Sequence, residues 1–555
     1  MAHPHDHDHD GDDYFGATER TPLVGNASSA ANNTPPASRR RPLAHLRGAS
    51  IASIASSLKV PTAHKPSTII LILAANIFFA ASSGALQQMA ATRIFEDVFC
   101  RQYYADKTEF QLGDPIDERM CKEDEIQSRL AFLFAVSISI DAIVGCLSAL
   151  PWGAAADRIG RKTVLVFCLA GFTMQIMWMM VVGWFSDTIP AEFYWLSSLT
   201  LLCGGGNAAA GACIGSMVSD ILPELERSVA FMQIHVASSV GNLLAPAIAS
   251  IMMVSLGPWP VMFVSLAVMA TCSVTVLFVP ETLQSKAQPD DAGALTLQDH
   301  AAQAVQELRN LLAIMKDPTI CVVLAVFLLS LPPYLSTYQF LLQFVSKRYH
   351  IPIAETGFVQ STYGIAHIVV VLAFLPWLTK FVLRPSTPRF LRIENKHKRD
   401  LVLGRWSYAM TIVGSLILAV SPNLTGFTAG LLVMSFGAGA DSMIKSTASA
   451  LVAPDQTSRL FSLMAVMGIG SMLWTSPMLA GLFSLGMHLD GRNGGSGPWI
   501  GLPYLGVAAS TTLMLVLVCF VRAPSERKAS TVEAGEEGVD VQTSSSSNSE
   551  NEQRS

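Results

Sequence analysis

Residues 153–162 read Gly153-Ala-Ala-Ala-Asp157-Arg158-Ile-Gly160-Arg161-Lys162 and lie between two long apolar runs. The glycines suit a very short turn, because glycine adopts backbone angles that strain other residues. The cations are typical of a loop that stays on the cytoplasmic side of a membrane. The stretch therefore predicts a tight cytoplasmic turn between two membrane helices.

The composition indicates a membrane protein. Hydrophobic residues make up 51% of the 555 residues, charged residues only 14%, and the mean hydropathy is +0.41. Soluble chains carry about a quarter charged residues. The net charge of -5 and the absence of a basic domain argue against a nucleic-acid partner.

Twelve apolar runs predict twelve membrane-spanning helices, since each crossing needs about 20 mostly apolar residues. The runs lie near residues 67–90, 130–152, 162–185, 194–218, 229–254, 259–279, 319–342, 355–378, 401–421, 425–449, 459–486 and 500–521. An even number of crossings returns both termini to one side. Cations before the first run and in the loop 380–399 predict that this side is the cytoplasm.

The remaining segments are polar. Residues 1–66 and 522–555 are predicted to be disordered cytoplasmic tails, because they lack apolar periodicity. The alternating His and Asp residues at positions 3–10 are either a loose metal site or solvated tail; no structural metal site is expected. Residues 284–318 are predicted to form a cytoplasmic linker with an amphipathic helix. The expected location is the plasma membrane, with the vacuolar membrane as the alternative.

The chain also repeats itself. Leu-Pro-Trp occurs at 150–152 and again at 375–377. Pro223 precedes Pro246 by 23 residues, and Pro454 precedes Pro477 by the same 23. Three matches in the same order predict two similar six-helix halves, residues 67–283 and 319–521, which meet where a substrate site forms.

Several motifs resemble those of the major facilitator superfamily. Residues 153–162 match its G-x-x-x-D-R-x-G-R-K/R signature, and Pro280-Glu-Thr282 resembles the signature that closes its first half. Residues 241–249 resemble a degenerate antiporter motif, G-x-x-x-G-P-x-x-G. The arrangement is similar to fungal members beside secondary-metabolite genes, and its cysteine-bearing first loop is similar to proton-coupled folate transporters. The resemblance implies an all-α integral membrane fold with twelve transmembrane helices in two pseudo-symmetric bundles.

The resemblance also implies gate residues. Asp157 would face the start of span 11, where a helix N-terminus favours a carboxylate. Asp220 and Arg227 resemble a second gate pair, and Gly241, Pro246 and Pro477 would bend their helices. The alternative is an ordinary basic turn. The cytoplasmic gate candidates are Gly153, Asp157, Arg158, Gly160, Arg161, Lys162, Asp220 and Arg227.

Charged residues inside predicted spans are candidates for proton coupling. Asp141 lies twelve residues before Gly153, which is about 18 Å along a helix. A low dielectric disfavours the ionised carboxylate, as a reversible proton carrier requires; the alternative role is packing. Asp441 and Lys445 are four apart and share a helix face, where they either neutralise each other or take part in coupling.

Other polar residues in the spans either line a cavity or bond neighbouring helices. Two of them are histidines, which titrate near neutral pH. The cavity candidates are Asn76, Gln175, Asn207, His235, Gln339, Gln343 and His367. Outside the spans, Cys100 and Cys121 lie 21 residues apart in a predicted outer loop, 93–129. They are either free thiols or a disulfide worth about 3 kcal/mol on the chain-entropy model.

The sequence thus predicts a secondary transporter, with proton-coupled efflux of a small organic compound as the first hypothesis. Proton-coupled uptake of a nutrient or organic anion and a non-transporting sensor are the alternatives. No nucleotide loop, metal set or nucleophile motif occurs, so neither an enzyme nor a cofactor is expected. The expected partners are a small-molecule substrate, protons and the lipid bilayer, with the chain acting as a monomer.

Overall fold

The regular structure of the described residues is helical. The computed structural model describes residues 65–107, 117–282, 317–383, 396–449, 451–452, 457–491 and 497–521. Within these ranges, twelve helices are long and apolar enough to cross a membrane, and each overlaps one predicted run in order. The predicted tails and amphipathic linker lie almost wholly outside the described residues.

The first half comprises residues 65–282 and contains six candidate spans. Its helices pack around buried apolar side chains such as Met89, Phe95 and Leu130. Its elements are α2 (Pro66–Lys107), η1 (Glu118–Lys122), α3 (Asp124–Ile159), α4 (Arg161–Trp184), η2 (Ala191–Cys203), α5 (Gly206–Ile221), α6 (Glu224–Leu256), α7 (Pro258–Thr275) and η3 (Val276–Phe278).

The second half comprises the described residues from 317 to 521 and contains six more candidate spans. Its elements are α9 (Pro318–Leu328), α10 (Pro332–Tyr338), α11 (Leu341–Tyr349), α12 (Ile353–Val369), η4 (Val370–Phe374), α13 (Leu375–Leu383), α14 (Lys396–Val420), α15 (Leu424–Ser435), α16 (Ala440–Ser449), α17 (Thr457–Gly491), η6 (Pro498–Gly501) and α18 (Leu502–Phe520).

The first loop is shorter than predicted. The sequence was expected to leave its first helix before Arg93, but α2 continues to Lys107. Ile94, Phe95, Val98 and Phe99 are all buried at helical spacing between the charged residues of this segment. The charged positions therefore occupy the other faces of a continuing helix, and the predicted loop boundary at 93 was wrong.

Several spans that were predicted as continuous are interrupted by glycine or proline. Gly205 and Gly206 adopt φ values of +84° and +63° between η2 and α5, a region that favours glycine. Two prolines, Pro332 and Pro333, begin α10, because proline is tolerated in the first turn of a helix but not in its interior. These breaks change the direction of the chain inside a span.

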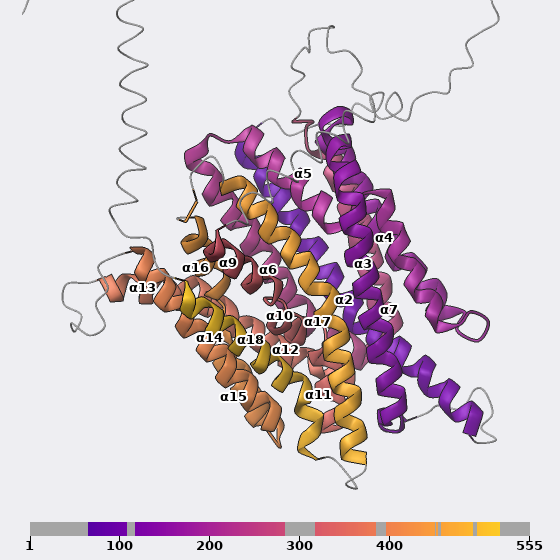
Figure 1. Ribbon diagram of the computed structural model, residues 1–555. Coiled ribbons are helices and arrows are strands. Elements are labelled where there is room, and N and C mark those ends of the chain that lie inside the picture. Colours follow the sequence, from indigo (N-terminus) through magenta and orange to yellow (C-terminus); the bar gives the residue numbers. More distant parts are fainter. Residues whose placement is uncertain are drawn as a thin grey trace, which may run out of the picture. The chain divides into compact units, whose positions relative to one another are not determined.

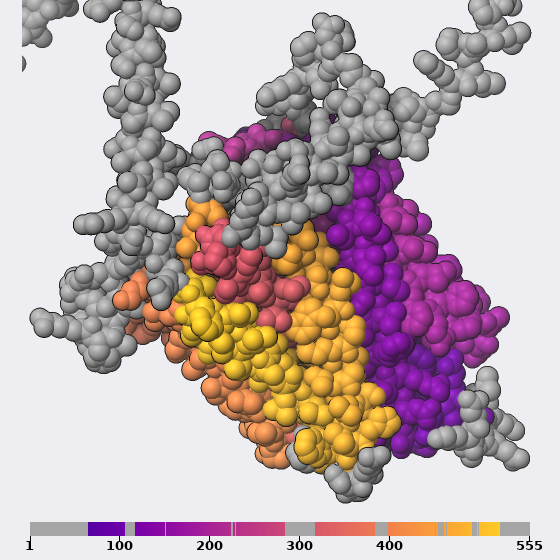
Figure 2. Space-filling model, in the orientation of Figure 1, coloured from indigo at the N-terminus to yellow at the C-terminus, as the bar shows by residue number. Residues whose placement is uncertain are grey.

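The halves meet along two pairs of helices. α3 packs against α17, and α6 packs against α12. Figure 1 shows α3 and α17 side by side, and Figure 2 shows the second half, orange and yellow, against the purple first half along this seam. We call the end of the helices that carries residues 117–129 and 341–353 the disulfide face. The end that carries residues 153–162 and 220–227 is the motif face.

Candidate functional site

A small cavity lies on the seam between the two halves. Its volume is about 40 Å³, and α2, α3, α11, α17 and the end of α10 all contribute to its wall. Its lining is apolar apart from amide and hydroxyl groups, and none of the lining residues is charged. Among the lining residues are Gln88, Phe134, Gln339, Phe340, Gln343 and Ser476.

Contacts between the halves close this cavity on the side of the disulfide face. Gln343 Nε2 in α11 donates to the backbone oxygen of Gln127 at 2.6 Å and to its Oε1 at 3.1 Å. Lys347 Nζ lies 2.6 Å from Asp124 Oδ1 and also donates to the backbone oxygen of Lys122. We call this set of contacts the seal.

The seal extends beyond α11. The backbone N–H of Ile353 donates to Glu118 Oε1 at 2.8 Å, and the hydroxyls of Ser128 and Ser484 lie 2.6 Å apart. In the contacts of α11 and α12 with η1 and the start of α3, donors of the second half meet acceptors of the first half, whereas Ser128 of α3 donates to Ser484 of α17. The structure is therefore closed at the disulfide face.

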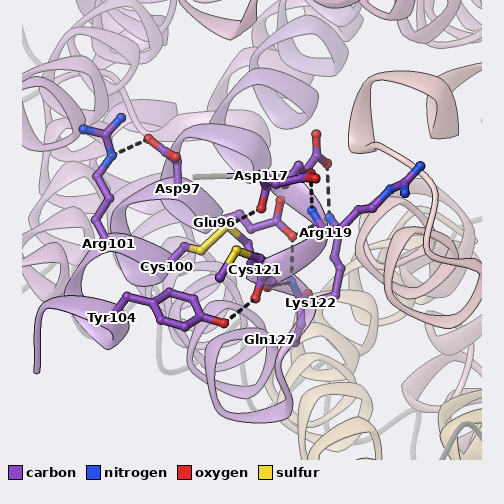
Figure 3. The surroundings of a disulfide bond; sticks show 12 residues. Glu96, Asp97, Cys100, Arg101, Tyr104, Asp117, Arg119, Cys121, Lys122 and Gln127 are labelled. Carbon is purple, nitrogen blue, oxygen red and sulfur yellow. Dashed lines mark hydrogen bonds and ion pairs between the residues drawn. A yellow bond between two sulfur atoms is a disulfide. The ribbon is translucent and has the colours of Figure 1, made fainter. Parts of the chain in front are cut away.

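A disulfide and a buried ion pair hold the first-half side of the seal. The structure joins Cys100 of α2 to Cys121 of η1, the pairing expected from the sequence. Figure 3 shows Lys122 and Gln127 converging on Glu96 beside this disulfide, each 2.6 Å from Glu96 Oε1. Glu96 is fully buried, and a buried carboxylate is tolerated only when paired and hydrogen-bonded. The ion pair therefore ties η1 to α2.

The second-half side of the seal is anchored as well. Arg348 Nη1 donates to the backbone oxygen of Ala419 at 3.0 Å, and the Tyr349 hydroxyl donates to that of Ser421 at 3.0 Å. Burial raises the pKa of the Tyr349 phenol, so it stays protonated and keeps donating. α11 is thus fixed to the end of α14, and both sides of the seal are held by their own half.

The motif residues of 153–162 cross-link helices of the first half. Gly160 has φ +106°, and the N–H of Arg161 donates to Glu281 Oε1 at 2.9 Å. Arg161 also forms an ion pair with Asp220 of α5, and Lys162 Nζ donates to the backbone oxygen of Leu277 at 2.6 Å. Residues of the signature and residues near the end of the first half, Leu277 and Glu281, therefore form one cluster.

This cluster corrects one expected pair. Asp220 pairs with Arg161 and not with Arg227, whose guanidinium donates to the backbone oxygens of Ser219 and Leu222. The reason is that Arg227 lies in the first turn of α6 and turns back on the loop that precedes it. Asp157 is exposed, and the side chains that begin α17 lie outside the described residues. The contact expected for Asp157 therefore stays a prediction.

Asp141 lies next to the cavity wall. Phe134, Ile138 and Asp141 follow each other on α3 at spacings of four and three residues, so they share one face of that helix. Gln175 Nε2 of α4 lies 3.1 and 3.3 Å from the two oxygens of Asp141. Its partner is thus a neutral amide from within the first half.

Asp441 and Lys445 occupy one exposed face of α16. No ion pair joins the two within the described part of the chain. Lys445 Nζ instead lies 5.6 Å from the ring centroid of Phe327, within the range of a cation–π contact. Both charges remain accessible, and mutual neutralisation through a close ion pair does not occur.

His235 and His367 line one small cavity together. The first comes from α6 and the second from α12, so one histidine of each half lies at the seam. The Tyr363 hydroxyl lies 3.5 Å from His367 Nδ1. The sequence analysis named both as cavity candidates, but nothing in the chain spacing of the two residues relates them.

The other predicted residues have packing roles or lie at the surface. Asn76 donates to the backbone oxygen of Cys272 at 3.0 Å and to Thr275 Oγ1 at 2.6 Å, so it joins α2 to α7 and lines none of the cavities described above. Asn207 is exposed. At Gly241, a Cβ would lie 2.5 Å from the Phe78 backbone oxygen, so this glycine lets α6 approach α2 closely.

The two expected helix-bending prolines both lie inside long helices. Pro246 lies within α6 and Pro477 within α17, where the missing N–H of each removes one helical hydrogen bond. These two helices form opposite sides of the seam, α6 facing α12 and α17 facing α3. The two prolines hold equivalent places in the two halves, as the repeat in the sequence predicts.

Sequence reasoning identified Gln343 as a cavity candidate but missed the other residues of the seal and its anchors. Glu96, Lys122, Gln127 and Lys347 were assigned to loops, and their burial was not expected. The signal available was the crowding of ten acids and six bases between residues 93 and 129. Such crowding does not reveal which of the charges are buried.

Comparisons with known proteins agree with this fold. Residues 127–393 match the family model described as Major Facilitator Superfamily. The MFS efflux pump atnC of Emericella nidulans is 28% identical over 453 residues, which cover 79% of this chain and 84% of the relative. The efflux pump ustT of Aspergillus flavus is 25% identical over 445 residues, 76% of this chain and 84% of the relative.

Solved structures share the fold at low identity. A D-xylose-proton symporter superposes with a TM-score of 0.56 at 13% identity, covering 82% of this chain and 98% of that one. The human organic anion transporter MFSD10 superposes with a TM-score of 0.52 at 17% identity, covering 82% and 100%. Two helical halves around a seam define a multi-pass membrane transporter. Residues 127–393 thus carry the sequence pattern of the major facilitator superfamily, and the described chain has the fold of its solved transporters.

Proposed function

We propose that this protein exports a small organic compound in exchange for protons by alternating access. The observation that carries the proposal is the seam cavity, which both halves line and which their own contacts close at one face. Rocking the halves would break the seal and open the cavity to the other side. The relatives named as efflux pumps support the export direction.

The proposed orientation has the disulfide face outside. Disulfides persist in oxidising surroundings, whereas cytoplasmic thiols are kept reduced. The cations of residues 153–162 then lie in the cytoplasm, together with both termini, as the positive-inside rule expects. In this orientation the seal closes the cavity to the exterior. We expect the plasma membrane and not the vacuole as the site.

Asp141 is the proposed proton carrier. It shares a face of α3 with two cavity-lining residues, Phe134 and Ile138, and lies beside the cavity without lining it. The Gln175 amide stabilises the ionised form, and protonation would remove the charge before the halves reorient. The exposed Asp441 and Lys445 would tune this exchange, while Arg161 and Asp220 would hold the loop of the inner gate with Asp157.

Flux in liposomes with an imposed pH gradient tests this proposal. The probes are neutral 7-hydroxycoumarin, cationic rhodamine and anionic fluorescein. An antiporter accumulates its substrate in the acidic compartment above the level in protein-free liposomes, because protons and substrate move in opposite directions. Accumulation in the alkaline compartment would support the uptake alternative and overturn export.

Asp141→Asn tests the carrier within the same assay. Asparagine keeps a hydrogen-bonding partner for Gln175 but cannot release a proton. We expect gradient-driven flux to fall to the protein-free level, while substrate exchange without a gradient persists. An unchanged gradient dependence would remove Asp141 from the proton path.

A further inference from the structure

We propose that Gln343 couples occupancy of the seam cavity to opening of the disulfide face. We further propose that the occupant is a neutral molecule bearing both a hydrogen-bond donor and an acceptor. This inference rests on the proposed function, because the occupant is taken to be the transported compound. The sequence motifs predicted a small organic compound, but neither the seal nor this pair of groups on the compound.

Gln343 belongs to the seal and to the cavity wall at once. Its side chain is buried, with 4% exposed, and it lines the cavity. Its amide nitrogen is engaged by both oxygens of Gln127 across the seam. An acceptor on a bound molecule would compete with Gln127 for those N–H groups, and the seal would lose two of its contacts.

Gln127 is the fixed partner in this pair. Its own Nε2 donates to Glu96 Oε1 at 2.6 Å and to the backbone oxygen of Cys121 at 3.0 Å. Both acceptors belong to the part of the first half that the disulfide and the buried Lys122 hold in place. Gln343 is therefore the side chain that changes its hydrogen-bond partner when a ligand binds.

Gln339 indicates what else the occupant carries. It lines the same cavity, and its amide oxygen is buried without a hydrogen-bond partner among the described residues. A buried acceptor without a partner is unfavourable and uncommon in native structures. An N–H or O–H group of a bound molecule would supply the missing bond.

The rest of the wall indicates a neutral, apolar body. Phe134, Ile138, Leu335 and Phe340 provide apolar contact, and none of the lining residues is charged. A charged molecule would lose its hydration there without gaining an ion partner. The chemistry that fits is an aromatic or aliphatic compound with hydroxyl, amide or carbonyl groups.

The test measures opening of the disulfide face directly and does not require a flux measurement. Ser250 of α6 is fully buried, its hydroxyl has no partner among the described residues, and it lies next to Gly357 of α12 at the seam. Ser250→Cys therefore places a small reporter thiol there. A membrane-impermeant maleimide added at the disulfide face reacts with it only when the halves part. The protein without this substitution measures the background.

In this reporter protein, Gln343→Leu should raise the resting labelling rate. The expected increase is roughly two- to tenfold, since the closed state loses the hydrogen bonds of one amide. Gln360→Leu is the matched control: Gln360 is buried in α12, donates to the Tyr338 backbone oxygen and does not line the cavity. An equal rate in Gln343→Leu and the parent would overturn the coupling role.

The ligand class is tested with two probes at mildly acidic pH, where both are neutral. We expect 7-hydroxycoumarin to speed labelling of the parent, and 7-methoxycoumarin, which lacks the donor for Gln339, to speed it less. Gln339→Leu should keep the parent's resting rate but lose the response to 7-hydroxycoumarin. Equal responses to both probes, or no response to either, would overturn the ligand class.

The Gln343→Leu protein completes this test. Neither probe should raise its labelling further, because the contact that the ligand displaces is already absent. A full response in Gln343→Leu would overturn the coupling. Failure of the export proposal would look different: gradient-driven flux would be missing while the labelling responses remained.

Discussion

At the scale of single residues, the carboxylates of Glu96 and Asp141 in the first half differ in their partners. Glu96 is surrounded by cations, with Lys122 at 2.6 Å and Arg93 at 3.4 Å. Asp141 has the neutral Gln175 amide at 3.1 Å, and no ion pair to it forms within the described residues. A buried carboxylate paired with cations ties together the segments that carry them, whereas one held by a neutral amide has no cation to pair with. Glu96 is therefore structural.

Replacing Glu96 tests this structural role. Glu96→Gln removes the closer of the two counter-ions of Lys122, which is only 4% exposed and keeps Glu118 at 3.1 Å. Breaking a buried pair outright costs about 3–5 kcal/mol, and the remaining pair with Glu118 reduces this cost. We expect a clear loss of thermal stability of the purified protein in detergent, measured by its unfolding midpoint. Glu125→Gln is the control, because the Glu125–Arg129 pair is half exposed and is worth about 0–1 kcal/mol. Equal midpoints for both variants would contradict the assignment.

At the scale of elements, η1 acts as a platform that its anchors keep in place. It presents backbone and side-chain acceptors to α11 and α12 and has only five residues. So short an element has little stability of its own. Its position therefore depends on the disulfide and on the ion pair of Lys122 with Glu96.

Removing the disulfide should consequently loosen the seal. Cys100→Ser with Cys121→Ser frees a loop of 21 residues, which the chain-entropy model values at about 3 kcal/mol. We expect faster maleimide labelling of Ser250→Cys than in the disulfide-bonded protein, and mild reduction of the latter should have the same effect. If labelling stays slow in both cases, the ion pair alone holds the platform.

At the scale of the whole molecule, alternating access requires the two faces to open in turn. The seal accounts for closure at the disulfide face. The cluster of Arg161, Asp220 and Glu281 gives the first half a rigid edge at the motif face, from which the exposed Asp157 projects. Weakening closure at the motif face should therefore favour the state that is sealed at the disulfide face.

Asp157→Ala tests this balance between the faces. If Asp157 helps to close the motif face, its loss should slow labelling of Ser250→Cys from the disulfide face. It should also speed labelling, from the motif face, of a cysteine introduced into the cavity wall. Asp187→Ala is the control, because Asp187 is an exposed acid just beyond the disulfide-face end of α4. No change at either face would count against the gate role of Asp157.

Local patterns in the sequence were sufficient for the broad architecture. The number of spans follows from apolar runs of bilayer length, and the two halves follow from repeated proline spacings. The disulfide was one of two alternatives that followed from the place of Cys100 and Cys121 in one acidic stretch. These properties depend on residues close together in the chain, so no knowledge of helix packing was needed.

Tertiary structure decided which residues meet. The burial of Glu96, the pairing of Asp220 with Arg161 and the contact of Gln343 with Gln127 depend on how each helix is rotated and what packs beside it. Gln127 and Gln343 are 216 residues apart, and no local period relates them. Apolar runs determine that a helix crosses the membrane, whereas contacts between distant helices determine which of its faces carries the function.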